Sequence, residues 1–306
     1  MNAQEAVPFR LRSSGRNRDM LVQLAIGDAY GKRFESSDAR AIAPHNDGVS
    51  YASRHVPDLS AAVGRYTDDT QMTLAIAAAI VDQDPWTPVS LAQRFVDCFK
   101  RDPRSGYAPR FHGFLEEVHD GREFVSRIQP QSERSGAAMR AAPIGVFADI
   151  PTVVGRAQMQ GAITHDTPGG LASAAAAALM THYFLYGLGP RNTLGLFIDA
   201  HVPGWSWGQP WRGHVSLKGV DCAHAAITAV VEGHSLRDVL PRAVAFGGDT
   251  DTVATIAMAA ASCCPDLPND LPAALYERLE DGPYGRTYLH ELDRRLLGRV
   301  QRERMA

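Results

Sequence analysis

Two short segments, far apart in the sequence, crowd carboxylates and hydroxyls together just before an alanine-rich apolar stretch. The first reads YTDDT at residues 66–70 and is followed by QMTLAIAAAI, and the second reads GDTDT at residues 248–252 and is followed by VATIAMAAA. Asp and Thr are preferred at helix N-termini, where a carboxylate also suits the helix dipole, and alanine is the strongest helix former. We call these segments the first and second acidic boxes and expect each to begin a buried helix.

Helical patterns dominate the rest of the chain. Thr87-Pro88 predicts an N-cap followed by proline at the first helical position, and the segment from Ser235 to Asp238 is a capping-box pattern. Few stretches alternate apolar and polar residues with the period of two that predicts a strand. The sequence therefore predicts an all-α fold. Further helices are expected over residues 21–26, 71–81, 170–188, 221–231 and 253–264.

Composition limits the classes of partner and the number of domains. Of the 306 residues, 45% are hydrophobic and 21% are charged, which is typical of a globular protein with a large core. The formal net charge of −3 makes nucleic acid an unlikely electrostatic partner. Residues 1–17 are polar and basic and are predicted to be a flexible N-terminal extension. No linker interrupts the remainder, so residues 18–306 are predicted to form a single domain.

The cysteines and the apolar stretches favour a cytoplasmic protein without a membrane anchor. The four cysteines include no CxxC pair, and Cys263 and Cys264 are adjacent in an alanine-rich stretch, so buried free thiols are expected. The N-terminus lacks the apolar core of a secretory signal. The most apolar stretch, residues 171–188, is rich in alanine and contains His182, so it predicts a buried core helix and no membrane association.

Each acidic box has more oxygen atoms than a helix cap needs. A cap uses one side-chain oxygen, whereas each box brings two carboxylates and two hydroxyls within four residues. Either box alone is well explained as a helix cap. Taken together they favour a shared cation site, because crowded like charges are costly unless neutralised and hard divalent cations bind several oxygens. If the boxes form one site, the chain must fold back on itself.

Five motifs extend the pattern along most of the chain. They are IGDAYGKRFE, YTDDTQM, SGAAMRAAPIG, ITHDTPGGLASA and GGDTDTVATIA, in this order, over roughly residues 20 to 265. In this combination the sequence resembles the ADP-ribosylglycohydrolase family. The resemblance implies a compact, orthogonal helical bundle with a binuclear magnesium (or manganese) centre.

The same resemblance implies a set of metal ligands and catalytic residues. Catalytic roles fall on Glu35, Asp68 and Asp249, with Glu35 on a loop near the scissile ribose. Glu35 is also readily explained as an exposed loop carboxylate. The six implied metal ligands are Thr67, Asp68, Asp69, Asp249, Asp251 and Thr252.

The resemblance also implies residues on the substrate side. In place of Ser135, relatives often carry asparagine. Arg140 is a candidate for a phosphate contact, with a structural ion pair as the alternative, and His165 is either near the diphosphate or part of the core. Asp28 is also a candidate to support a metal ligand from behind. The implied substrate-binding residues are Asp28, Gly31, Ser135, Gly136, Met139 and His165.

The predicted function is a metal-dependent hydrolase that removes ADP-ribose from a modified acceptor and so reverses ADP-ribosylation. The acceptor is a protein side chain, with arginine favoured, or a small ADP-ribosyl compound. The alternative is a non-catalytic ADP-ribose binder or a toxin-blocking, immunity-type protein on the same fold, for which lost metal ligands would be expected. Residues 106–114 and the tryptophan-rich residues 204–211 are candidates for the acceptor side, although the tryptophans are equally suited to packing. The oligomeric state is not predicted.

Overall fold

The computed structural model describes residues 19–51 and 63–305. Over these residues the chain forms 15 α-helices and three short 3-10 helices, and its only β pairing consists of isolated bridges. The predicted all-α fold is confirmed. The predicted extension over residues 1–17 lies outside the described residues, and the single domain over residues 18–306 stays a prediction.

The helices follow one another with short connections, and their bounds are as follows. The α-helices are α1 (Met20–Lys32), α2 (Ala39–Ile42), α3 (Asp68–Val81), α4 (Pro88–Arg101), α5 (Pro109–Glu117), α6 (Gly121–Arg127), α7 (Gly136–Met139), α8 (Ile150–His165), α9 (Pro168–Tyr186), α10 (Leu194–His201), α11 (Gly219–Glu232), α12 (Leu236–Ala245), α13 (Thr250–Cys263), α14 (Ala273–Glu277) and α15 (Arg286–Met305). The 3-10 helices are η1 (Ala43–His45), η2 (Ala142–Val146) and η3 (Arg191–Thr193).

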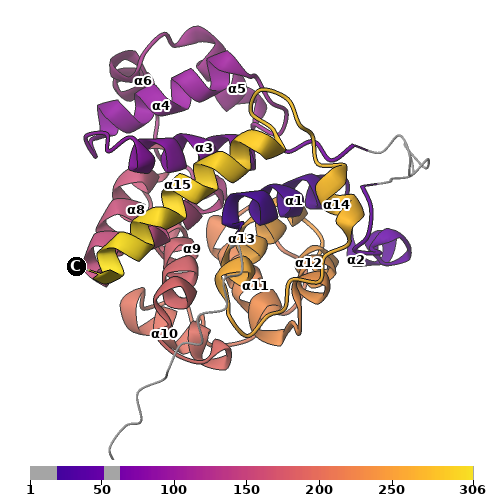
Figure 1. Ribbon diagram of the computed structural model, residues 1–306. Coiled ribbons are helices and arrows are strands. Elements are labelled where there is room, and N and C mark those ends of the chain that lie inside the picture. The colour runs from indigo at the N-terminus through magenta and orange to yellow at the C-terminus, as the bar shows by residue number, and fades with distance from the viewer. Residues whose placement is uncertain (1–18, 52–62, 306) are drawn as a thin grey trace, which may run out of the picture.

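The centre of the molecule is built from α1, α3, α9 and α13, which are buried along almost their whole length. Helices α1 and α13 pack side by side (Figure 1). Small residues permit this close approach, since a Cβ at Gly27 would lie only 2.5 Å from the carbonyl oxygen of Ala254. The alanine-rich helices that begin at the two acidic boxes are therefore core helices, as predicted.

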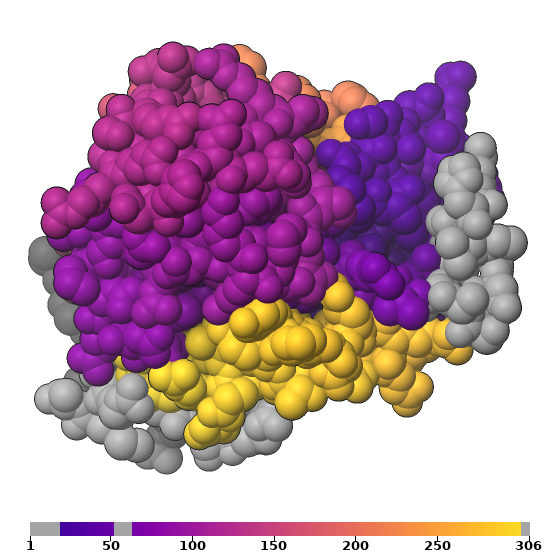
Figure 2. Space-filling model, turned by 90° about the horizontal axis from the view of Figure 1, so that it is seen from above, coloured from indigo at the N-terminus to yellow at the C-terminus, as the bar shows by residue number. Residues whose placement is uncertain are grey.

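Other helices enclose this centre on different sides. Helices α4, α5 and α6 gather beside α3 and share an aromatic cluster that includes Phe95, Phe111, Phe114 and Phe124. Helix α15 crosses α1 and α3 from the opposite end of the chain (Figure 1). Seen from above, the C-terminal segment lies along one side of the molecule, next to residues from the first half of the chain (Figure 2). The helices run in several directions, as expected for an orthogonal bundle.

Local signals in the sequence predicted several helix starts correctly. The Thr87 hydroxyl accepts from the Ser90 N–H at 3.3 Å with Pro88 at the first helical position, and the Ser235 hydroxyl accepts from the Asp238 N–H at 3.3 Å. All four cysteines are buried, and none of them forms a disulfide. No helix within the described residues is both long and apolar enough to cross a membrane.

Candidate active site

The first acidic box is held in place by a buried carboxylate from α1. Asp28 is fully buried and accepts four hydrogen bonds, from the backbone N–H and the hydroxyl of both Thr67 and Thr70, at 2.6 to 3.0 Å. The Thr67 hydroxyl in turn caps α3 by accepting from the Asp69 N–H at 3.4 Å. Asp28 therefore fixes the first turn of α3.

The side chains of the two aspartates of the first box, Asp68 and Asp69, line the interior of the site. The backbone N–H of Asp68 donates to the Ser105 carbonyl at 3.0 Å, which fixes its main chain, and Gly106 approaches so closely that a Cβ there would lie 1.9 Å from Asp68 Oδ1. Asp69 Oδ2 is buried and has no hydrogen-bond partner in the structure. A buried carboxylate oxygen without a partner is costly, and it marks a position that suits a cation.

The second acidic box begins α13 in a different way. Gly247 and Gly248 adopt left-handed backbone conformations, with φ of 75° and 80°, and a Cβ at Gly248 would lie 1.8 Å from the Val215 carbonyl oxygen. Only glycine fits such a turn. Asp249 precedes the helix without capping it. Instead its carboxylate accepts from the Ser135 hydroxyl at 2.7 Å and contacts Cys222 Sγ at 3.5 Å.

The end of α1 joins the two boxes. A Cβ at Gly31 would lie 2.6 Å from Asp251 Cα, and the Thr250 hydroxyl donates to the Gly31 carbonyl at 2.9 Å. Asp28 and Gly31 were predicted to bind substrate, but both are buried behind the wall of the site. Their contacts are made to the boxes, and substrate binding by these two residues stays a prediction. The alternative role considered for Asp28, support of a metal ligand from behind, agrees with its contacts.

The two boxes and Glu35 open into one cavity of about 150 Å³. Residues from seven separated segments line it, so the chain does fold back on itself as the shared-site hypothesis required. Thr67 is the one implied metal ligand that does not line it, because its hydroxyl donates to Asp28. The lining residues are Glu35, Asp68, Asp69, Gly106, Ala108, Phe111, Ser132, Arg134, Ser135, Gly136, Met139, His165, Leu217, Asp249, Asp251 and Thr252.

Several carboxylates of this cavity have raised pKa values. Burial, reinforced by Asp28, raises the pKa of Asp68 to about 8. Burial followed by the charge of Asp251 raises the pKa of Asp69 well above its usual value, and burial followed by Asp249 does the same for Asp251. Within the described part of the chain, no group of three or more His, Cys, Asp or Glu side chains is already arranged to hold a metal ion. Without a cation these carboxylates cannot all be ionised, and a bound cation would favour their charged forms.

Lys32 and Glu35 complete the acidic end of the cavity. Lys32 Nζ forms an ion pair with the Glu35 carboxylate and a second one, at 3.4 Å, with Asp251 Oδ2. Glu35 follows α1 in a turn whose next residue, Ser36, has a left-handed φ of 64°. A lysine one turn before an implied catalytic glutamate was visible in the sequence, but only the fold shows that it also reaches the second box.

The start of α7 and the end of α8 supply a further part of the cavity lining. A Cβ at Gly136 would lie 2.8 Å from His165 Cε1, so the backbone of Gly136 is in close contact with the imidazole. Thr164 Oγ1 is 2.7 Å from His165 Nδ1, and burial together with the charge of Arg140 lowers the pKa of His165 to about 3. The imidazole is therefore neutral at neutral pH and lines the cavity beside Ser135, Gly136 and Met139.

Two further candidates from the sequence have structural roles. Arg140 is buried, donates to Gln160 Oε1 at 2.6 Å and to Thr164 Oγ1 at 2.8 Å, and lies over the Phe95 ring. It does not line the cavity, which removes the phosphate contact considered for it. The tryptophans of residues 204–211 also lie elsewhere. Trp207 is buried and donates to the Val202 carbonyl at 2.8 Å.

Sequence reasoning missed several residues at the cavity. Phe111 and Ala108 fall within the loop that was predicted to serve the acceptor side, but Arg134, Leu217 and Cys222 were not singled out. Arg134 was detectable, because it directly precedes the substrate motif SGAAMR. Leu217 and Cys222 carry no local signal, and only the packing of α11 against α13 brings Cys222 to Asp249.

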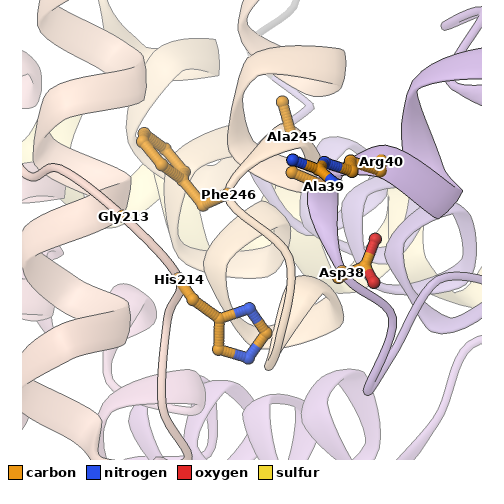
Figure 3. Close-up of a pocket in the computed structure, with 7 residues that line it drawn as sticks. All are labelled: Asp38, Ala39, Arg40, Gly213, His214, Ala245 and Phe246. Carbon is orange, nitrogen blue, oxygen red and sulfur yellow. The ribbon is translucent and has the colours of Figure 1, made fainter.

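A second, more open hollow of about 540 Å³ lies behind the second box. Asp38, Ala39 and Arg40 line one side, and Gly213, His214 and Phe246 line the other (Figure 3). Backbone hydrogen bonds of Gly248 with Ser36 and Ser37 tie the Glu35 turn to the second box between the two hollows. The wall that separates the hollows therefore includes the turn of Gly247 and Gly248.

Comparisons with known proteins place this geometry in context. The sequence profile of the ADP-ribosylglycohydrolase family matches residues 11–305. The ADP-ribosylhydrolase ARH3 of Xenopus tropicalis is 31% identical over 144 residues, which are 44% of this chain and 41% of the frog protein. The ADP-ribosylarginine hydrolase Tri1 of Pseudomonas putida is 25% identical over 79% of this chain and 68% of its own length. The match to the frog relative thus spans less than half of that protein.

A solved structure supports the fold independently. A chain from an ADP-ribosylglycohydrolase-related protein complex superimposes with a TM-score of 0.73 and 20% sequence identity. The match covers 93% of this chain and 98% of that chain. At 20% sequence identity, this similarity shows that the two chains share a fold.

Proposed function

This chain belongs to the ADP-ribosylglycohydrolase family, and on that premise we propose that it hydrolyses the bond between ADP-ribose and a modified acceptor. The observation that carries the proposal is the cavity in which the carboxylates of both acidic boxes meet Glu35. The non-catalytic alternative predicted lost ligands, and all six implied ligand positions keep their oxygen-bearing side chains.

We propose that two divalent cations, magnesium or manganese, bind between the boxes. Three observations on the donors fit such ions: the unpartnered Asp69 Oδ2, the raised pKa values of Asp69 and Asp251, and an all-oxygen donor set of the kind that hard cations prefer. When bound, the ions would hold the ribose hydroxyls and polarise a water. The residues that would hold them are Asp68, Asp69, Asp249, Asp251 and Thr252, which line the cavity, whereas Thr67, the sixth implied ligand, donates its hydroxyl to Asp28.

The protein's own groups have defined tasks in this reaction. The oxygen of a water molecule bonds to the anomeric carbon while the bond from that carbon to the acceptor atom breaks, and the proton that the water loses passes through Glu35 to the acceptor atom. Glu35 lines the cavity and accepts the proton from the water. The positive charge that develops on the ribose is stabilised by the surrounding carboxylates. Ser135 orients Asp249 through their hydrogen bond.

Charge sets the direction in which the substrate lies. One end of the cavity holds five carboxylates, and Arg134 is the only Lys or Arg among the described residues that line it. A diphosphate is repelled by the acidic end and attracted by the guanidinium. We therefore place the distal ribose at the boxes and the diphosphate near Arg134, Gly136 and the neutral His165.

For the acceptor we propose an arginine side chain of a protein, with a small ADP-ribosyl compound as the second candidate. Support for arginine comes from the Pseudomonas putida relative, whose name identifies it as an ADP-ribosylarginine hydrolase and whose match extends over 79% of this chain. The acidic end of the cavity is also suited to a guanidinium that leaves as a cation.

A side-by-side substrate assay tests this proposal. ADP-ribosyl-arginine, ADP-ribosyl-serine and O-acetyl-ADP-ribose are each incubated with the protein and either manganese or magnesium, with a chelator-treated sample as the control. Release of ADP-ribose is expected to be fastest from ADP-ribosyl-arginine and to stop with the chelator. Binding of ADP-ribose without turnover of any of the three would favour the binding-protein alternative.

A further inference from the structure

Lys32 is the last residue of α1, and its backbone is pressed against the second acidic box. Gly31 leaves no free space next to Asp251, and the Gly31 carbonyl accepts from the Thr250 hydroxyl. These contacts anchor Lys32 Cα beside the box. Only 29% of the Lys32 side chain is exposed, so this is a lysine held by its surroundings rather than one that moves freely in solvent.

The ammonium of Lys32 connects two groups with different tasks. It pairs with Glu35, the proposed proton acceptor, and at 3.4 Å with Asp251 Oδ2, a proposed metal ligand. The Asp251 side chain is 5% exposed, so the charges are only weakly screened. Burial lowers the pKa of Lys32, but the opposite charges of Asp251 and Glu35 raise it by a larger amount, so the net pKa lies above its usual value. The ammonium is therefore charged at neutral pH.

We propose that Lys32 is a positioning residue that holds Glu35 against the second box and competes with a divalent ion for Asp251. The inference rests on the proposed metal site. A tethered positive charge in contact with a carboxylate repels an incoming cation and occupies part of its coordination sphere. An ion bound on the Asp251 side would displace the ammonium, and Glu35 would then lose its link to Asp251. Ion binding and the position of the Glu35 turn are thus coupled.

Calorimetric titration of manganese into the chelator-stripped full chain tests the competition directly. Lys32→Met keeps the length of the side chain without its charge, and it is expected to bind manganese at least about tenfold more tightly than the unaltered protein. Lys32→Arg keeps the charge and is expected to bind manganese with nearly unchanged affinity. Lys218→Met is the matched control, because Lys218 pairs at 3.2 Å with Glu133, both of them exposed, and it should change nothing.

Hydrogen exchange supplies a readout for the position of Glu35. Exchange over residues 33–38 is expected to become faster in Lys32→Met and, in the unaltered protein, on addition of manganese. Circular dichroism establishes that the variants fold, and Lys32→Gln replaces Lys32→Met if that variant does not.

Each outcome of the titration either supports or overturns the proposed role of Lys32. Equal or weaker manganese binding by Lys32→Met overturns the role of Lys32 and leaves the proposed function intact. Binding by neither protein overturns both the role of Lys32 and the proposed metal site. Binding by Lys32→Met alone supports the competition and shows that the unaltered protein excludes the ion.

Discussion

The first and second acidic boxes carry similar residues, yet the structure supports them in different ways. The first box is fixed from behind by Asp28, which accepts four hydrogen bonds from Thr67 and Thr70. The second box starts at a left-handed Gly247-Gly248 turn, and its carboxylates contact Ser135, Cys222 and Lys32.

The difference separates a rigid half of the site from an adjustable one. The contacts that fix the first box are hydrogen bonds to one fully buried carboxylate, and they belong to the core. The side chains that contact Asp249 and Asp251 include Ser135 and Lys32, which are only half-buried, so a ligand that binds in the cavity can displace these contacts. We therefore expect substitutions behind the first box to affect stability most, and substitutions around the second box to affect activity most.

The largest expected effect on stability is that of Asp28→Ala. The change leaves four donors of Thr67 and Thr70 without their buried acceptor, so the free energy of unfolding should fall by about 3–5 kcal/mol. Urea unfolding followed by circular dichroism measures it. A loss below about 1 kcal/mol would show that the first box is not held by Asp28 and would remove the contrast between the boxes.

Melting temperatures measured over a range of pH test whether the buried carboxylate of Asp69, in the first box, has a raised pKa. In the folded protein the pKa of Asp69 is raised well above its usual value by burial and Asp251, so the folded state binds a proton that the unfolded state releases near pH 4. Stability is therefore lost as pH rises from about 4 toward the raised pKa. In chelator-treated protein, Asp69→Asn should have a higher melting temperature than the unaltered chain, and the gap should widen with pH. A gap that stays constant or narrows would contradict the raised pKa.

The smallest expected effect on stability is that of Ser135→Ala. The change removes the hydrogen bond to Asp249 and the longer one, at 3.3 Å, that the Ser135 hydroxyl accepts from the Thr252 hydroxyl, so the free energy of unfolding should fall by about 1–2 kcal/mol. Turnover should nevertheless fall by about tenfold, because Asp249 loses the group that orients it. Ser135→Asn keeps a donor at this position and serves as the control. Equal losses of turnover in the two variants would show that the hydrogen bond has no role.

The fold was predictable to the extent that local patterns determine it. Helix starts such as Thr87-Pro88 and Ser235 depend on neighbouring residues alone, and the alanine-rich stretches behind the boxes could only be buried helices. The convergence of the two boxes depends on contacts between segments far apart in the sequence. It was predicted from the excess of oxygen atoms in each box and from the family resemblance, because no local pattern determines it. The resemblance identified the residues near the cavity but could not separate those that line it from those that support it.

Asp28, Gly31 and Arg140 illustrate that limit. All three lie in motifs of the family, and each was considered for contact with substrate, but their side chains or backbones are directed into the protein. Lys32 and Cys222 show the opposite case. Nothing next to them in the sequence indicates that they contact Asp251 and Asp249, because these contacts arise from the packing of α1 and α11 against α13.

The central claim is that the two boxes act as one metal-dependent hydrolytic site, and single substitutions in each box test it most directly. The rate of ADP-ribose release is measured for Asp68→Ala and Asp249→Ala with saturating manganese, after circular dichroism has shown that both variants are folded. The account predicts that each variant loses at least about 10²–10³-fold in turnover. Retained turnover in either folded variant would contradict it.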